Sequence, residues 1–432
     1  MTQEKQTINL ELTDPIYRGS VQKLYDVPQH ADKLISETSV GGSVFDVGTI
    51  FSIEGSDTAR AGFRHLVFQH LHSPASWQAV ASYLEEMVGK EVLEQDELLK
   101  TTLAELTRSG AKTHHLGMVE RASGDVHSSG FPAELSNLTL IRKFTVKKPE
   151  LTRAMRWHYY DYSGYHALDG FVVPLEYIVR FGVTSGSSIL RKYSALSEKG
   201  QAQYMVELGL SGTLFPWQRF PSPIIDFTTK YEPEDRNITR QEAALMAGIS
   251  GELFARSNAM AILAAYMVHW IFDQMGLYLW DLKWEIATEN GELIFVDTID
   301  TDSVRATLPV ERDGHHYYVH FNKQAMRDYY RLATPDWYDA VNAAKKEAAQ
   351  SGEAFTQILA RGQDSGKYPR NPEIDPVFME LQERKFALIQ RFIRTNAQAG
   401  DYREEAMEIA EAEVDFFLKT DAGRYQAMNA ID

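Results

Sequence analysis

The sequence predicts an α+β fold with a small antiparallel sheet at the N-terminus, a larger α+β domain and a helical C-terminal segment. Residues 16–53 alternate around glycines, as short strands joined by tight turns do. Residues 76–109 repeat apolar side chains at three- and four-residue spacing, which is typical of amphipathic helices. A charged hairpin over 281–305 separates two long helical tracts, 239–276 and 380–418. We place the domain boundaries at 1–115, 116–330 and 331–432.

The remaining elements follow from local composition. Polar and small residues mark loops, whereas apolar runs bounded by turn residues mark strands. In chain order we expect a helix over 58–71, a polar loop over 123–137, strands over 138–144 and 170–181, a small-residue loop over 182–188, a loop rich in proline and threonine over 216–235, and a further helix from residue 321.

Length and composition narrow the class of protein. A chain of 432 residues fits two or three domains, and 44% hydrophobic with 24% charged residues is a globular mixture. The net charge is −16 and the basic residues are scattered, so we expect no nucleic-acid partner. The absence of cysteine excludes disulfides and a cysteine nucleophile. It is compatible with a reducing cytoplasm, where we expect the protein.

The sequence offers no membrane-spanning or secretory segment. The N-terminal residues are polar and lack the apolar core of a signal peptide. The most apolar run, 259–272, is shorter than the roughly 20 residues that a spanning helix needs. We therefore expect a buried helix there and no membrane partner.

The hairpin over 281–305 gathers charge in a pattern that suggests a site. Strand alternation places Asp281, Lys283 and Glu285 on one face, and it places Phe295 with Asp297 on one face of the second arm. Two carboxylates brought close together repel unless a cation lies between them. Mg²⁺ held by one or two carboxylates plus substrate phosphates is one such arrangement. The alternative is a solvated edge hairpin in which Lys283 is only a counter-ion.

Eight stretches in this order, between residues 17 and 330, resemble the SAICAR synthetase family of purine biosynthesis (phosphoribosylaminoimidazole-succinocarboxamide synthases). They are YRGSVQKLYDV, SVFDVG, KTH, PLEYIVRFGVTSGSSILRKY, PIIDFTTKYEPEDRNIT, DLKWEIA, VDTIDTDSVR and FNKQAMRDY.

The resemblance implies an ATP-dependent ligase with small-molecule substrates. It would join L-aspartate to the carboxylate of 5-aminoimidazole-4-carboxylate ribonucleotide (CAIR), through an acyl phosphate, and release SAICAR, ADP and phosphate. ATP would bind between the small and the larger domain, and a homo-oligomer is left open. Ser20 stands where the family usually has lysine, and Gln22 replaces a second basic residue. These departures keep two alternatives open: a paralogue acting on a related heterocyclic carboxylate, and a non-catalytic nucleotide-binding relative.

The resemblance also implies roles for individual residues. Lys283, Glu285 and Asp297 would be catalytic, with Mg²⁺ on Glu285 and Asp297. The implied ATP-binding residues are Gly19, Ser20, Gln22, Lys23, Lys230 and Lys283. The implied substrate-binding residues are Arg180, Ser187 and Arg191 at the ribotide phosphate, together with Asp235, Asp302, Ser303, Arg305, Lys323 and Arg327.

The other acids and the histidines receive simpler interpretations. Asp281 would support Lys283, Glu289 and Glu292 would only solvate the turn, and Asp300 has no assigned role. Four histidines lack a matching ligand set at zinc spacing, so we expect core or surface roles for His114, His115, His315 and His316.

Overall fold

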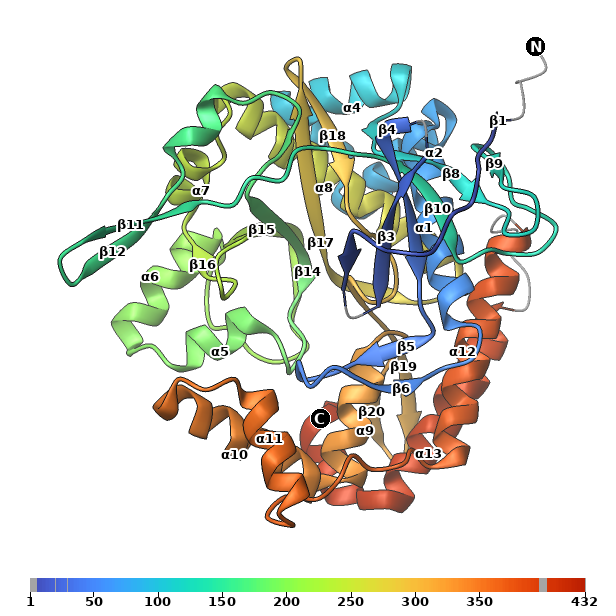
Figure 1. Ribbon diagram of the computed structural model, residues 1–432, viewed down its shortest axis with the longest axis vertical. Helices are drawn as coiled ribbons and strands as arrows, with labels where there is room; N and C mark the ends of the chain where they lie inside the picture. The colour runs from blue at the N-terminus through green and yellow to red at the C-terminus, as the bar shows by residue number, and fades with distance from the viewer. Residues whose placement is uncertain (1–5, 20, 29, 396–401, 432) are drawn as a thin grey trace.

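The computed structural model describes residues 6–19, 21–28, 30–395 and 402–431, and it is mixed α+β as the sequence predicts. Two large sheets lie side by side, the first antiparallel and the second antiparallel except for the parallel pair β7–β18, with helices behind and below them (Figure 1). One large apolar core connects helices α1, α8 and α12 with the second sheet. The C-terminal segment is therefore packed into the body of the protein.

The first sheet is built mainly from the N-terminal third of the chain. Its neighbouring strands are all antiparallel. In spatial order they are β1 (Gln6–Thr7), β9 (Asp125–His127), β8 (His115–Val119), β10 (Leu138–Arg142), β4 (His30–Thr38), β3 (Gln22–Val27) and β2 (Tyr17–Arg18). The sheet thus extends to Arg142, beyond the boundary expected at residue 115. The prediction of a loop over 123–137 is wrong for residues 125–127, which form β9. The domain boundaries stay predictions.

The second sheet is organised around its longest strand, β17 (Tyr278–Glu289). The first half of β17 pairs with β14 and β19, and its second half pairs with β13 and β18. The other strands are β16 (Asn237–Ile238), β15 (Arg219–Thr229), β14 (Leu175–Gly182), β19 (Val304–Arg312), β20 (His315–His320), β21 (Ala430–Ile431), β13 (Phe171–Val172), β18 (Glu292–Val296) and β7 (Lys112–Thr113), which pairs with β18.

Strand β15 corrects a prediction from the sequence. The expected loop over 216–235 is wrong for residues 219–229, which form this strand. Pro221 and Pro223 favoured the loop, because proline removes a backbone donor from a sheet ladder. The neighbouring strand β16 pairs only with Phe227 and Thr228, so the prolines lie where the outer edge of β15 has no partner strand among the described residues. An unpaired edge tolerates proline, and the apolar residues that follow complete the strand.

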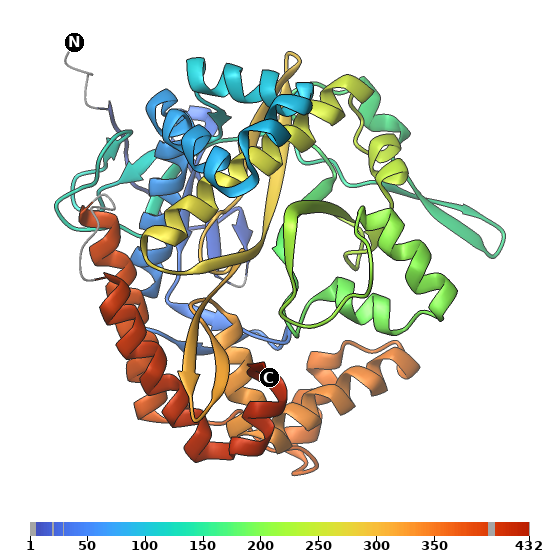
Figure 2. The ribbon, with the colours of Figure 1, turned by 180° about the vertical axis from the view of Figure 1, so that it is seen from behind.

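The helices cover the back of the second sheet and close the molecule below. Helix α8 lies behind β14, β15 and β17, and α2 and α4 pack on α8 (Figure 2). Gly89 and Asp96 divide the expected 76–109 tract into three helices. The helices that precede β17 in the chain are α1 (Ser56–His72), α2 (Pro74–Val88), α3 (Lys90–Gln95), α4 (Glu97–Ser109), α5 (Ser188–Ser194), α6 (Glu198–Leu208), α7 (Arg240–Met246) and α8 (Gly251–Gln274).

The C-terminal helices pack on the N-terminal region. Helix α12 contacts both α1 and α13, and α13 contacts β19 and β20. The remaining elements are α9 (Gln324–Ala333), α10 (Pro335–Ser351), α11 (Phe355–Asp364), α12 (Pro376–Thr395), α13 (Tyr402–Asn429), the 3₁₀ turn Ser163–Ala167, and the hairpins β5 (Gly41–Ser43) with β6 (Thr49–Ser52) and β11 (Glu150–Ala154) with β12 (Trp157–Asp161). None of the described helices is both long and apolar enough to cross a membrane.

Candidate active site

Strand β17 presents the central charged residues because its other face belongs to the core. Leu282, Trp284 and Ile286 are buried in the apolar core. Alternation therefore turns Lys283 and Glu285 to the opposite face. There the Lys283 ammonium lies 2.5 Å from Glu176 Oε1 and 3.1 Å from Glu285 Oε1. The apolar pattern of the strand thus decides where its charged side chains gather.

A second lysine and a third carboxylate complete a compact cluster. The Lys230 ammonium forms an ion pair with Glu285 and lies 3.9 Å from Glu176. Asp297 Oδ2 lies 4.0 Å from the Lys283 ammonium. Burial opposes the charge on Lys283, but Glu285 and Glu176 outweigh it and raise the Lys283 pKa. Lys283 is therefore a permanent cation rather than a proton carrier.

Asp297 reaches the cluster through an unusual backbone conformation. Strand β18 ends at Val296, opposite Glu285, and its Phe295 packs against Trp284 on the core face. Continued alternation would turn Asp297 toward that core face, so the expectation that it shares a face with Phe295 is wrong. Asp297 instead has a φ of 63°, in the left-handed region, and its carboxyl hydrogen-bonds to Glu285.

His114 helps to hold this turn. Its backbone N–H donates to the Phe295 carbonyl at 2.9 Å, and its buried ring hydrogen-bonds to the Asp297 backbone. The expected core role for His114 therefore includes support of a site residue, which the sequence did not indicate.

The two carboxyls of Glu285 and Asp297 differ in their protonation. Burial and the adjacent Glu285 raise the pKa of Asp297 well above its usual range. Burial opposes ionisation of Glu285 as well, but Lys283 and Lys230 overcome it and lower the Glu285 pKa. A close carboxyl pair in which Glu285 is buried and Asp297 is half-buried at the cleft is a suitable place for a divalent cation, which would remove the repulsion. The described residues hold no group of three or more metal-binding side chains, so the protein would supply only part of the coordination.

A cleft of about 1010 Å³ opens between the two sheets beside this cluster. Lys230, Glu285 and Asp297 line it on one side, and residues of the first sheet line the other, including Tyr17, Gln22, Leu24 and Leu34.

The other residues expected at ATP lie around the start of β3. Gly19 forms the turn into this strand, where its N–H donates to the Gln22 carbonyl at 2.8 Å. Lys23 lies 3.7 Å from Glu37 and does not line the cleft. Ser20 lies outside the described residues.

A second pocket of about 230 Å³ lies at the other end of the charged face of β17. Lys283 lines this pocket while touching Glu285 of the cleft, so the lysine stands between the two cavities. The pocket brings together most of the expected substrate-binding residues: Arg180, Asp302, Ser303, Arg305, Lys323 and Arg327.

The cations of this pocket are not equivalent. Arg180 is buried and donates to Asp226 at 2.7 Å and to Asp281 at 2.9 Å, so its charge is neutralised. Asp281 therefore pairs with arginines, including Arg305 at 3.0 Å, rather than with Lys283. Lys323 has no carboxylate within 4.0 Å among the described residues.

Lys323 and Arg327 lie at the start of α9 and carry excess positive charge. Burial and the nearby Arg327 lower the pKa of Lys323. Burial together with Arg305 likewise lowers the pKa of Arg327. Because a helix N-terminus adds further positive potential, this end of the pocket is suited to an anion.

Three expected substrate-binding residues lie elsewhere. Ser187 is buried at the N-terminus of α5, and its hydroxyl has no partner among the described residues. Arg191 is exposed on α5 and does not line the pocket. Asp235 lies near the Lys283 cluster, where burial and the charge of Glu176 raise its pKa.

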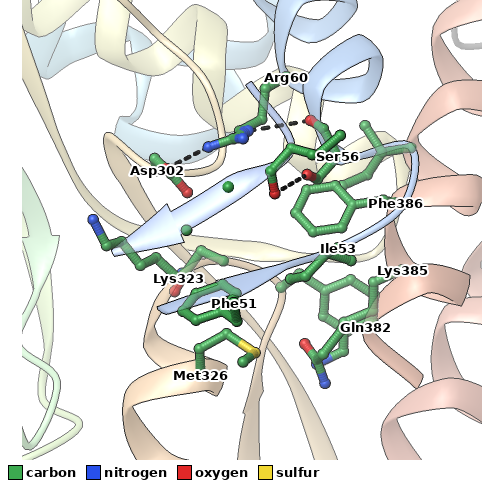
Figure 3. Close-up of a pocket in the computed structure, with 16 residues that line it drawn as sticks. Phe51, Ile53, Ser56, Arg60, Asp302, Lys323, Met326, Gln382, Lys385 and Phe386 are labelled. Atoms are coloured by element: carbon green, nitrogen blue, oxygen red, sulfur yellow. Dashed lines mark hydrogen bonds and ion pairs between the residues drawn. The ribbon is translucent and has the colours of Figure 1, made fainter. Parts of the chain in front are cut away.

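Helix α1 supplies a support for the pocket that the sequence did not indicate. Arg60 donates to Asp302 at 2.8 Å, beside Lys323 (Figure 3). One turn later Arg64 donates to Asp300 at 2.8 Å, and both side chains are buried. Asp300 thus anchors the loop that carries Asp302. The four-residue spacing of the two arginines is the only local signal for this role.

Other carboxylates also gain partners that local patterns did not show. Glu176, within the quoted PLEYIVRFG stretch, accepts from Thr228 of β15 at 2.7 Å as well as from Lys283. The turn glutamates do more than solvate the hairpin. Glu289 pairs with Arg142 at 2.8 Å, and Glu292 lies 3.3 Å from Lys112.

The chain is similar to known proteins over part of its sequence and most of its fold. Residues 164–344 match the family model of SAICAR synthetase. An Archaeoglobus fulgidus protein with the provisional name phosphoribosylaminoimidazole-succinocarboxamide synthase is 32% identical over 243 residues, covering 56% of this chain and 66% of that protein. The synthase of that name from Thermoplasma acidophilum is 31% identical over 164 residues, covering 38% of this chain and 53% of the relative. The alignments thus span less than two thirds of these relatives.

A solved structure extends the likeness to most of the fold. SAICAR-synthase from Saccharomyces cerevisiae, complexed with SAICAR, covers 90% of this chain and 98% of its own, with a TM-score of 0.51 and 17% identity. At that identity the likeness shows a shared fold. The chain is therefore similar in sequence to SAICAR synthetase over residues 164–344, and it shares the fold of a SAICAR synthase over most of its length.

Proposed function

We propose that this protein uses ATP to ligate L-aspartate to the carboxylate of CAIR, giving SAICAR, ADP and phosphate. One observation carries the proposal: Lys283 lies between two cavities of different character. The carboxyls of Glu285 and Asp297 line the cleft, and the cations Lys323 and Arg327, which form no ion pair among the described residues, line the pocket. A nucleotide with its cation suits the cleft, and a phosphorylated, carboxylate-bearing substrate suits the pocket. The match of residues 164–344 to the family model of SAICAR synthetase supports the same pair of substrates.

The ribotide phosphate is assigned to the start of α9. Lys323 and Arg327 form no ion pair with a carboxylate of the described residues, and their pKa values are lowered by burial and by neighbouring cations. A phosphate there would also accept from Arg305 and from backbone N–H groups of the helix N-terminus. Arg180, which is already paired with two carboxylates, would orient Asp281 and Asp226 instead.

The nucleotide phosphates are assigned to the cleft beside Glu285 and Asp297. These two carboxyls would hold Mg²⁺, which when bound would neutralise charge on the phosphates. Lys230 and Gln22 line the same cleft from the two sheets. The cleft has a volume of about 1010 Å³, which is large enough for a nucleotide.

The reaction needs positioning and charge stabilisation from the protein. A CAIR carboxylate oxygen would attack the γ-phosphorus, and ADP would leave. The aspartate amine would then attack the acyl carbon, lose a proton and expel phosphate. Lys283 remains protonated throughout, so it would stabilise the charge that develops on the transferred phosphoryl group and on the acyl oxygen. Glu176 would orient the Lys283 ammonium.

The proposal is tested with purified protein, ATP, Mg²⁺, L-aspartate and CAIR. ADP release and SAICAR formation should both depend on CAIR and on aspartate. ADP release no faster than the rate without CAIR would refute it. A preference for another heterocyclic acid in a substrate panel would indicate the paralogue, and calorimetric nucleotide binding without turnover would indicate the non-catalytic relative.

A further inference from the structure

A two-stranded arm extends away from the body in both views (Figures 1 and 2). Its strands, β11 and β12, pair with each other, and neither joins another strand among the described residues. We call residues 146–160 the basic arm. Its base borders the nucleotide cleft through Lys148, whereas its strands contribute no residue to either cavity of the candidate site. The arm also lies outside the region 164–344 that matches the family model.

The basic arm exposes large apolar side chains. The Trp157 side chain is 70% exposed, and Met155 at the tip is fully exposed. Trp157 and Tyr159 share one face by alternation, and their ring centroids lie 6.3 Å apart in an edge-to-face arrangement. Exposed aromatic groups of this kind are typical of protein–protein contacts.

The conformation of the arm also points to a partner. Met155 has a φ of 59°, in the left-handed region that favours glycine or asparagine. An isolated two-stranded hairpin is only marginally stable in water. The arm nevertheless keeps a continuous register from Glu150–Asp161 to Ala154–Trp157. A partner that covers one face would stabilise this register.

The charge of the arm is opposite to that of the rest of the protein. Residues 146–160 carry Lys147, Lys148, Arg153 and Arg156 against one acid, Glu150, for a net charge of +3. Asp161, the last residue of β12, lies opposite Glu150 at the base of the arm and lowers this to +2 when it is included. The whole chain carries −16, so the remainder carries −19. Within the part of the chain that the structure describes, no carboxylate lies within ion-pair distance of Arg153 or Arg156.

A surface on the same chain has the complementary character. Residues 85–98, which we call the acidic face, run from the end of α2 through α3 into α4. They carry one lysine and six exposed acids, Glu85, Glu86, Glu91, Glu94, Asp96 and Glu97, for a net charge of −5. Met87, Val92 and Leu98 are exposed among them. The arm and α4 lie apart in Figure 1, so one molecule does not bring them together.

We propose that two copies of this chain pair by placing the basic arm of each on the acidic face of the other. Trp157, Tyr159 and Met155 would cover the exposed apolar side chains of the partner copy, and the arm arginines would meet its glutamates. A reciprocal exchange of arms closes into a dimer with two equivalent contacts. The polyanionic alternative, a nucleic acid, is disfavoured by the charge of −19 on the remainder of the chain.

The area available favours a reciprocal contact over one between the arms alone. Two aromatic side chains bury about 400 Å² when covered. A stable interface buries about 800 Å² on each partner. Contact between two arm faces alone falls short of this. If each copy contributes both an arm and an acidic face, the buried area on each copy is about doubled.

The experiment measures self-association of the full-length chain by sedimentation velocity and by size-exclusion chromatography with light scattering. The wild type should show a concentration-dependent dimer at micromolar concentration, and Trp157→Glu should be monomeric there. Leu245→Glu is the matched control, since Leu245 is 74% exposed on α7, outside both surfaces, and should leave the dimer unchanged. A monomeric wild type, or a dimer that survives Trp157→Glu, would overturn the proposal.

A charge exchange tests the pairing of the two surfaces directly. Arg153→Glu with Arg156→Glu should weaken the dimer about tenfold, and so should Glu86→Lys with Glu91→Lys. Combining all four changes should restore most of the wild-type affinity. Additive weakening in the combined variant would refute the pairing, as would a monomeric chain that binds single-stranded RNA through Trp157. Ligase activity is measured alongside and should be unaffected by Trp157→Glu, so the two proposals fail independently.

Discussion

The buried pair Arg64–Asp300 offers a test of how the loop beside the substrate pocket is held. The two side chains are 3% and 5% exposed, and one 2.8 Å bond joins them. Asp300 has a second partner, because its Oδ1 accepts from the Asp302 N–H at 2.9 Å. Arg64 is less well satisfied, since its Nε and second terminal nitrogen have no partner among the described residues.

These contacts predict that the two single variants differ in stability. In Asp300→Asn the Arg64 guanidinium stays charged and buried, because arginine does not deprotonate. We therefore expect the unfolding free energy to fall by about 3–5 kcal/mol. In Arg64→Met the Asp300 carboxyl keeps its other bond, from the Asp302 N–H, so we expect the unfolding free energy to fall by a smaller amount, about 2 kcal/mol. In the double variant neither charge of this pair remains, so its unfolding free energy should fall by less than that of Asp300→Asn.

The assay is urea unfolding at pH 7, followed by both tryptophan fluorescence and far-UV circular dichroism. Coincidence of the two transitions is the condition for comparing unfolding free energies. The CAIR KM of each folded variant is measured in parallel, because the same loop carries Asp302. If Arg64→Met costs more than Asp300→Asn, or the double variant is less stable than both, the account of this pair is refuted.

Three further predictions concern the site and the response to acid. Asp297→Asn should reduce ligase turnover at least about a thousandfold while the circular dichroism spectrum is retained; near-normal turnover would contradict the role at the cation. Lys323→Met should raise the CAIR KM about tenfold or more with little change in kcat, whereas Arg191→Met should leave both unchanged; equal effects would remove the phosphate assignment. Burial lowers the pKa of His65 and His269 from 6.5 to about 4, so the unfolded chain binds more protons between these values. The two histidines together should therefore remove up to about 3 kcal/mol of stability per pH unit as pH falls below 6.5, and unfolding midpoints that stay constant from pH 7 to 5 would contradict this.

The sequence by itself determined the elements that depend on local periodicity. The alternation in β17 is enough to bury Trp284 and to turn Lys283 and Glu285 together onto the polar face. The apolar run 259–272 is buried within α8, as its length and composition predicted. These features could be predicted because side-chain periods of 2 and 3.6 residues act within one segment. The ordered motifs likewise pointed to SAICAR synthetase, whose family model matches residues 164–344.

Only the tertiary structure decided which charges are paired and which remain available. The sequence suggested that Arg180 binds phosphate, but Asp226 neutralises its charge. Asp226 lies on β15, which its two prolines led us to predict as a loop. Asp297 departs from alternation through its positive φ, next to the ring of His114. Asp300 gains a role because Arg64 reaches it from a helix 236 residues earlier. Coulombic and hydrogen-bond partners are set by distance in space, and local sequence patterns do not encode contacts between segments so far apart.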